Sequence, residues 1–87
     1  MSAPAPYAPA RKRSVTLRGH RTSVSLEPVF WEALRRMARA RALSVNALAA
    51  RIDAERPPEV GLASALRQAV AAELLARAEA AAPAPED

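Results

Sequence analysis

Residues 21–26 read Arg-Thr-Ser-Val-Ser-Leu, an alternation in which every second side chain is β-branched or leucine. This period of two is typical of a half-buried strand whose apolar side chains lie on the covered face. The opposite face carries one guanidinium and two small hydroxyls, at Arg21, Ser23 and Ser25. Such donors on a slim ribbon suit the DNA major groove, which admits an α-helix or a two-stranded β-ribbon. These three residues are therefore candidate base contacts.

A lone strand leaves backbone groups unpaired along both edges, so this strand needs a partner. Residues 14–17, Ser-Val-Thr-Leu, alternate in the same way and precede a turn signal at Arg18-Gly19. They either fold back as a hairpin or extend the strand outward past the glycine. We favour the extension, because a wide sheet enters a groove less easily than two strands. The partner strand then comes from a second copy of the chain, which predicts a homodimer.

A first helix is expected from Pro28 to about Arg41. The residue before a proline favours β conformation, and proline is favourable in the first helical turn, so the strand gives way to the helix at Glu27. An apolar stripe marks the face that the helix buries, formed by Phe30, Leu34, Met37 and Ala38. Trp31 flanks this stripe, as expected of an aromatic residue at the edge of the core or in a dimer contact.

A second helix is expected from Val45 to about Glu55, because the pattern breaks at residues 42–44 and Ser44 is a good N-cap. A helix N-terminus offers amide donors and a partial positive charge, which together favour a bound phosphate. Side-chain donors at Ser44 and Asn46 could add to it. Ser44, Val45 and Asn46 are therefore candidate phosphate contacts.

A third helix, from Leu62 to about Ala78, follows the Pro57-Pro58 stop and Gly61. One of its faces is apolar and consists of Leu62, Leu66, Ala69, Val70 and Leu74. This face can pack on the first two helices, pair across a dimer, or bind another protein through residues 62–77. We favour packing within the dimer.

The net charge of +4 hides an asymmetry between the two parts of the chain. Residues 1–52 carry ten basic and two acidic side chains, whereas residues 53–87 carry three basic and seven acidic ones. The positive part includes the predicted strand, which favours a polyanionic partner there. A basic cluster precedes the strand and is a candidate to follow the phosphate backbone: Arg11, Lys12 and Arg13.

The amino-acid composition argues against catalysis and against bound metals. The chain has no cysteine and its only histidine is His20, so a disulfide or a zinc site is not expected. It also lacks a glycine-rich phosphate loop and enough chain to enclose a pocket. We expect neither enzymatic activity nor a cofactor.

Composition predicts three segments. Residues 1–13 are expected to form a disordered basic arm, residues 14–77 the folded domain, and residues 78–87 a disordered tail, because the ends are rich in alanine and proline. No apolar run approaches the roughly 20 residues of a membrane span, and no signal peptide is recognisable. A cytoplasmic protein is the expectation.

The order of strand, proline-started helix, short turn and serine-capped helix over Arg21 to about Ile52 resembles the ribbon-helix-helix fold of Arc/MetJ-type repressors. Core and cap positions of that family fall on Leu34, Met37, Ala38, Leu43, Ser44, Ala47 and Leu48. The longer run over residues 12–27 is similar to small stand-alone bacterial members. One departure is Ala42, where such proteins often have glycine; a positive φ there would cost about 1 kcal/mol.

The resemblance implies a mostly α fold with one short β-strand per chain and an additional C-terminal helix. It also implies an intertwined homodimer with a two-stranded antiparallel ribbon that enters the major groove of double-stranded DNA, while helix N-termini clamp phosphates. The expected function is a sequence-specific transcription regulator, a repressor or autoregulator. The alternative is an antitoxin-like or other protein-interaction module that uses the C-terminal helix.

Overall fold

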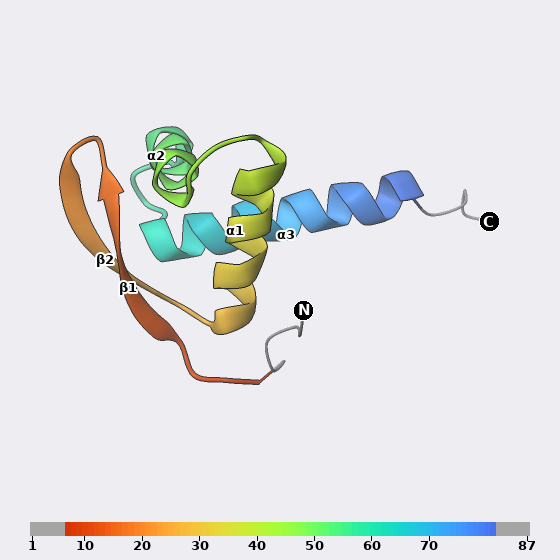
Figure 1. Cartoon of the computed structure of the whole chain (residues 1–87), viewed down its shortest axis with the longest axis horizontal. Coiled ribbons are helices and arrows are strands. Elements are labelled where there is room, and N and C mark those ends of the chain that lie inside the picture. The colour runs from red at the N-terminus through yellow and green to blue at the C-terminus, as the bar shows by residue number, and fades with distance from the viewer. Residues whose placement is uncertain (1–6, 82–87) are drawn as a thin grey trace.

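The computed structural model describes residues 7–81, which form a β-hairpin packed against three helices (Figure 1). The hairpin lies at one end of the molecule, and the last helix begins near the hairpin, passes α1 and runs to the opposite end. The elements in chain order are β1 (Arg11–Leu17), β2 (His20–Leu26), α1 (Pro28–Ala40), α2 (Val45–Glu55) and α3 (Leu62–Ala81).

The strand at residues 21–26 finds its partner within its own chain. β1 and β2 pair antiparallel, with Val15 opposite Thr22 and Leu17 opposite His20. Arg18 and Gly19 form the turn with φ angles of 52° and 86°, and positive φ at both central residues matches the twist of a hairpin. The predictions of an outward extension and of one strand per chain are therefore wrong.

The segment boundaries also differ from those predicted. Residues 11–13 belong to β1 and not to a disordered arm, and residues 78–81 continue α3. The cause at the first boundary is non-local, because the indole Nε1 of Trp31 donates a hydrogen bond to the Arg11 carbonyl at 2.9 Å. Residues 7–10 precede β1 and belong to no helix or strand, and the rest of the predicted disorder, residues 1–6 and 82–87, lies outside the described residues.

The hydrophobic core lies between the inner face of the hairpin and the three helices. Leu34 of α1, Leu48 of α2 and Leu66 of α3 are each at most 1% exposed. Trp31 is buried in α1, whereas Phe30 is only partly buried, so the buried stripe of that helix is rotated slightly toward Trp31. The remaining buried residues are Val15, Val24, Leu26, Met37, Ala38, Ala49, Ile52, Ala65 and Val70.

Helix α1 ends in a Schellman motif. The amide of Leu43 donates to the carbonyl of Ala38 at 2.9 Å, and the amide of Ala42 donates to that of Arg39 at 3.0 Å. This motif requires a left-handed residue at its centre, and Ala42 has φ of 56°. The positive φ considered from the sequence is present, and alanine therefore occupies a conformation that favours glycine.

Ala42→Gly is expected to stabilise the protein by about 0.5–1 kcal/mol. The substitution relieves about 1–2 kcal/mol of left-handed strain, and the extra freedom of glycine in the unfolded chain offsets about 0.4–1 kcal/mol of this gain. Urea denaturation measures the difference. Ala40→Gly, two residues earlier in the helix, is the matched control and should lose about 0.5–1 kcal/mol. A loss for both variants would contradict strain at Ala42.

The Arg67 side chain of α3 contacts the junction between β2 and α1. Its Nε donates to the Glu27 carboxylate at 3.0 Å, one guanidinium nitrogen lies 3.3 Å from the Ser25 carbonyl oxygen, and the guanidinium carbon stands 5.8 Å from the centre of the Phe30 ring. The hydrogen bond from Arg67 holds the pKa of Glu27 below its usual value, so this carboxylate stays ionised at neutral pH. The contact positions the N-terminal half of α3 against the hairpin.

Candidate nucleic-acid interface

The outward face of the hairpin is polar along its whole length. Side chains alternate between the two faces of a strand, and directly opposed residues share a face. Val15 and Val24 point inward and are buried, so the neighbours of each valine along its strand point outward. The outward pairs are Lys12 with Ser25, Ser14 with Ser23, and Thr16 with Arg21.

This outward face holds the three predicted base contacts together. Arg21, Ser23 and Ser25 are all exposed on β2, as the alternation in the sequence predicted. The structure adds Ser14 and Thr16 from β1, which were not among the residues predicted for the site. Their signal was present, since residues 14–17 alternate like a strand, but it points to this face only once the hairpin is known.

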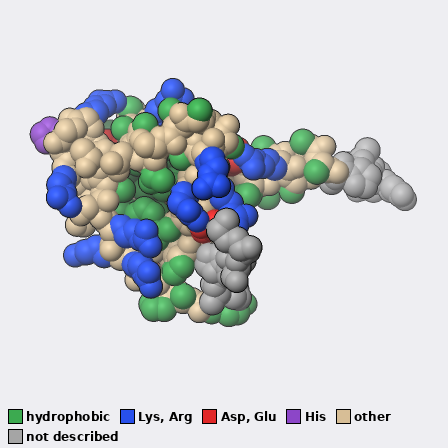
Figure 2. Space-filling view, viewed as in Figure 1, with side chains coloured by type: hydrophobic (Ala, Val, Ile, Leu, Met, Phe, Trp, Pro, Cys, Tyr) green, Lys and Arg blue, Asp and Glu red, His purple; other side chains and the backbone are tan. Residues whose placement is uncertain are grey.

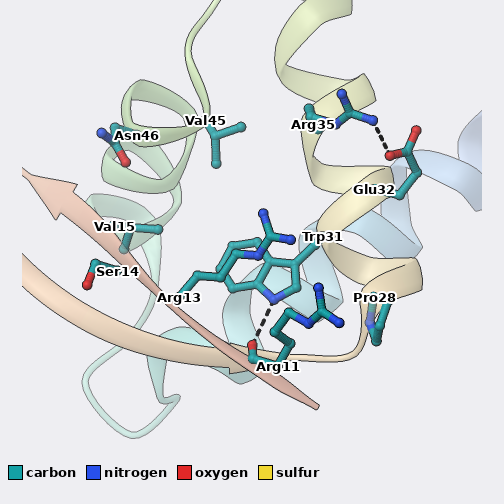
Figure 3. A pocket seen from close by; sticks show the side chains of 10 residues that line it. All are labelled: Arg11, Arg13, Ser14, Val15, Pro28, Trp31, Glu32, Arg35, Val45 and Asn46. Carbon is teal, nitrogen blue, oxygen red and sulfur yellow. Dashed lines mark hydrogen bonds and ion pairs between the residues drawn. The ribbon is translucent and has the colours of Figure 1, made fainter. Parts of the chain in front are cut away.

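A second feature is a pocket of about 480 Å³ where β1, α1 and the start of α2 meet. Figure 3 shows Arg11 and Arg13 flanking the indole of Trp31, while Arg35 turns toward Glu32. The Arg13 guanidinium carbon lies 5.7 Å from the centre of the indole ring, a cation–π distance. Three guanidinium groups and one carboxylate therefore surround a cavity that suits an anion.

Glu32 balances part of this positive charge. Hydrogen bonds from Arg35 and Arg36, the latter at 2.7 Å, lower the pKa of the Glu32 carboxyl below its usual value. The carboxylate is therefore ionised at neutral pH, and it neutralises much of the charge that Arg35 would offer a ligand. Arg11 and Arg13 remain as the principal cations of the pocket, because neither makes a salt bridge within residues 7–81.

The first turn of α2 borders the same pocket. The Ser44 hydroxyl accepts a hydrogen bond from the Ala47 amide at 3.0 Å, which confirms the predicted N-cap. Asn46 Oδ1 accepts a hydrogen bond from the Thr16 amide at 3.1 Å and so joins α2 to β1. Val45 and Asn46 line the pocket together with the cations of β1, and they belong to the first helical turn, whose amides lack partners within the helix.

The six predicted phosphate contacts do not all lie in one place. Arg11, Arg13, Val45 and Asn46 line one pocket, although they come from separate elements. Lys12 points to the other side of the strand and joins the outward face of the hairpin. The Ser44 hydroxyl serves as the helix cap, and its side chain lies outside the residues that line this pocket.

Positive charge dominates the surface around both features. Lys and Arg side chains gather over the hairpin and α1 in the view of Figure 2, where little acidic surface is visible. Within residues 7–81, three or more His, Cys, Asp or Glu side chains nowhere come close enough together to hold a metal ion. Across the same residues, each helix is too short or too polar to cross a membrane.

Comparison with known proteins gives one family. A family model described as "Ribbon-helix-helix domain" matches residues 10–74, about three quarters of the chain and all of the hairpin, α1 and α2. The curated proteins and the solved structures contain no match to the chain.

Proposed function

Because this chain belongs to the ribbon-helix-helix family, a family of DNA-binding regulators, we propose that it is a sequence-specific transcription regulator acting on double-stranded DNA. The outward face of β2 enters the major groove, and the chain acts as a repressor or autoregulator. One observation carries this proposal. Six outward residues form a slim face without a single apolar or acidic side chain, directly behind a well-packed core.

Arg21 is the proposed principal base contact. A guanidinium can donate two hydrogen bonds to the O6 and N7 atoms of one guanine, which is the commonest specific side-chain contact in the major groove. Ser23 and Ser25 lie on the same strand face, but their hydroxyls donate or accept and so tolerate several bases. Sequence preference therefore rests mainly on Arg21.

We propose that the DNA-binding unit is a homodimer in which β2 pairs with β2 of a second copy. The outer edge of β1 is engaged, since the Thr16 amide is bonded to Asn46 of α2. The Ser25 carbonyl points to the opposite edge of the hairpin, the free side of β2, where Arg67 contacts it. Backbone groups of alternate residues point to the same edge, so those of Arg21 and Ser23 point there too. Arg67 reaches this edge at Ser25, the end of the strand, so a second strand can still pair along Arg21 and Ser23.

Such a dimer has a four-stranded sheet, and the width of this sheet relative to the major groove determines which strands can enter the groove. Three strand spacings of about 4.8 Å give about 14 Å between the outer strands, compared with a major groove about 12 Å wide. The two central β2 strands can enter the groove, while the β1 strands lie beside its walls. Lys12 then faces the phosphates, and Arg11 and Arg13 reach the backbone through the pocket beside α2.

Selection of bound duplexes from a random pool tests the function directly. The proposal expects an enriched motif with two-fold symmetry, because a symmetric dimer reads two related half-sites. Absence of binding at low salt, with the protein folded by circular dichroism, would remove the proposal.

A double variant, Arg11→Gln with Arg13→Gln, tests the pocket as a phosphate site. Affinity should fall on every duplex, and the slope of log K against log salt should decrease by up to about 1.8 per chain, about 0.9 for each phosphate that is no longer neutralised. The emission of Trp31 and thermal melts monitor the fold, since Arg13 covers the indole. Arg39→Gln, on the last turn of α1, is the matched control. An unchanged slope in the double variant would make these arginines structural.

A second function class has one observation in its favour. The antitoxin-like or protein-binding alternative uses residues 62–77, and the C-terminal half of α3 exposes Leu74 and Leu75. The N-terminal half of the same helix is part of the core through Leu66 and Val70. A partner protein would therefore bind only the outer half of α3, and copurification from the native host with an identified protein would favour this class.

A further inference from the structure

The C-terminal half of α3 extends beyond the core. Helix α3 has 20 residues, but its buried residues, Ala65, Leu66 and Val70, all lie in the first half. Between residues 71 and 81 only Glu73 is partly covered, and its carboxylate pairs with Arg41 at 2.7 Å. One side of Leu74 borders a pocket shared with α1, and past it the helix extends away from the body in Figure 1. Eleven residues at 1.5 Å each make about 16 Å of projecting helix.

This projecting half carries an apolar stripe. Leu74 is 53% and Leu75 is 71% exposed, and with Tyr7 they are the large apolar side chains that the described part of the chain exposes. Ala71, Leu74, Leu75 and Ala78 follow the i, i+3, i+4, i+7 spacing that places residues on one face of a helix. All four are exposed, and none is charged.

We propose that this stripe pairs with the same stripe of a second copy, with the two α3 helices antiparallel. The order Ala-Leu-Leu-Ala at positions 71, 74, 75 and 78 reads the same in both directions. A two-fold axis between Leu74 and Leu75 therefore places leucines against leucines and alanines against alanines. Such a self-complementary patch is what a two-fold contact requires, and antiparallel helices also align their dipoles favourably.

The size of the stripe favours a second copy over an unrelated protein. A projecting helix about 16 Å long and about 10 Å across buries a few hundred Å² per partner, below the roughly 800 Å² of a stable specific complex. A contact this small becomes effective when two units form it twice, because the second of two linked contacts occurs at high effective concentration. The homodimer proposed above carries two α3 helices, so two such dimers meet this condition.

The position of α3 separates this contact from the hairpin. The projecting half and the hairpin lie at opposite ends of the molecule in Figure 1. Pairing through α3 therefore leaves the outward face of the hairpin accessible, and it doubles the mass of whatever unit the hairpins form. The inference does not rest on DNA binding, and its test contains no DNA.

Sedimentation of the full chain over a range from micromolar to millimolar concentration tests the pairing. The wild type should shift to a species of twice the mass at the upper end, and Leu75→Glu should abolish this shift. Ala76→Glu is the matched control, since it adds the same charge one residue later, about 100° around the helix. Circular dichroism should show equal helix content for all three proteins.

Cysteine cross-linking gives the geometry. The natural chain has no cysteine, so Leu75→Cys introduces a single thiol next to the two-fold axis. Mild oxidation should cross-link most of this variant, whereas Ala81→Cys should remain uncross-linked, because the two thiols would lie about 20 Å apart along the helices. Cross-linking of Ala81→Cys alone would indicate another register and overturn the proposal. Two sedimentation results would also overturn it: equal loss of the larger species in both glutamate variants, or a wild type that keeps one mass at all concentrations.

Discussion

Leu66→Ala is expected to lower the free energy of unfolding by about 2–5 kcal/mol, the range for leucine truncation in a packed core. Leu66 is fully buried on α3, against a core that also contains Leu34 and Leu48. Domains of this size have a total stability of roughly 4–13 kcal/mol, at about 0.05–0.15 kcal/mol per residue. The loss is therefore a large fraction of the total stability.

Urea denaturation followed by far-ultraviolet circular dichroism measures this loss. Leu74→Ala makes the same change two turns later on α3, where the side chain is half exposed, and should cost less than about 1 kcal/mol. Equal losses in the two variants would show that α3 does not divide into a core half and a projecting half. A small loss for Leu66→Ala would remove α3 from the core altogether.

Arg21→Ala is expected to weaken binding to the preferred duplex by about 1–3 kcal/mol and binding to scrambled duplexes much less. Arg21 is exposed on the outward face of β2 and its side chain is not part of the core, so the fold should be unaffected. Specificity should therefore collapse while thermal stability stays the same. Titration of both duplexes, with melting curves alongside, measures the two effects separately.

Ser44→Ala should behave in the opposite way. It removes the hydroxyl that accepts a hydrogen bond from the Ala47 amide, so the free energy of unfolding should fall by around 1 kcal/mol. The start of α2 faces a phosphate in the proposed complex, and phosphates carry no sequence information, so any loss of affinity should be the same on both duplexes. Equal losses on both duplexes for Arg21→Ala would mean that β2 does not read the bases.

Local signals in the sequence were sufficient to place the helices. The proline at the start of α1 and the serine cap of α2 act within a few residues of the boundary they set, and both boundaries are as predicted. These features could be predicted because their causes lie next to them in the chain. A left-handed conformation at Ala42, which the structure shows, had been raised only through the resemblance, because similar proteins often have glycine there.

The pairing of β1 could not be settled from the sequence because its causes are distant. Residues 14–17 suit either a hairpin or an extension. The choice depends on the burial of Val15 against the helices and on the hydrogen bond from Thr16 to Asn46, thirty residues away. Another distant contact, the hydrogen bond from Trp31 to the Arg11 carbonyl, fixes the start of β1. The alanine- and proline-rich composition of the preceding segment had assigned residues 11–13 to a disordered arm.

The residue at which burial of α3 ends could not be predicted from the sequence either. Periodicity predicted a face that includes both Leu66 and Leu74, but only the first is buried. A hydrophobic period shows which residues share a face, and it does not show where the neighbouring elements stop. For the candidate site, the alternation on β2 placed Arg21, Ser23 and Ser25 correctly on one exposed face, and their contacts with DNA remain predictions.

The strict alternation of the hairpin has an evolutionary consequence. The six outward residues contribute no side chain to the core, whereas the inward valines carry the packing. Surface substitutions away from caps and core usually change stability by no more than about 0.5 kcal/mol. Mutations at these six positions can therefore accumulate with little loss of folded protein. A duplicated copy of the gene could acquire a new target through this face while its scaffold stays unchanged.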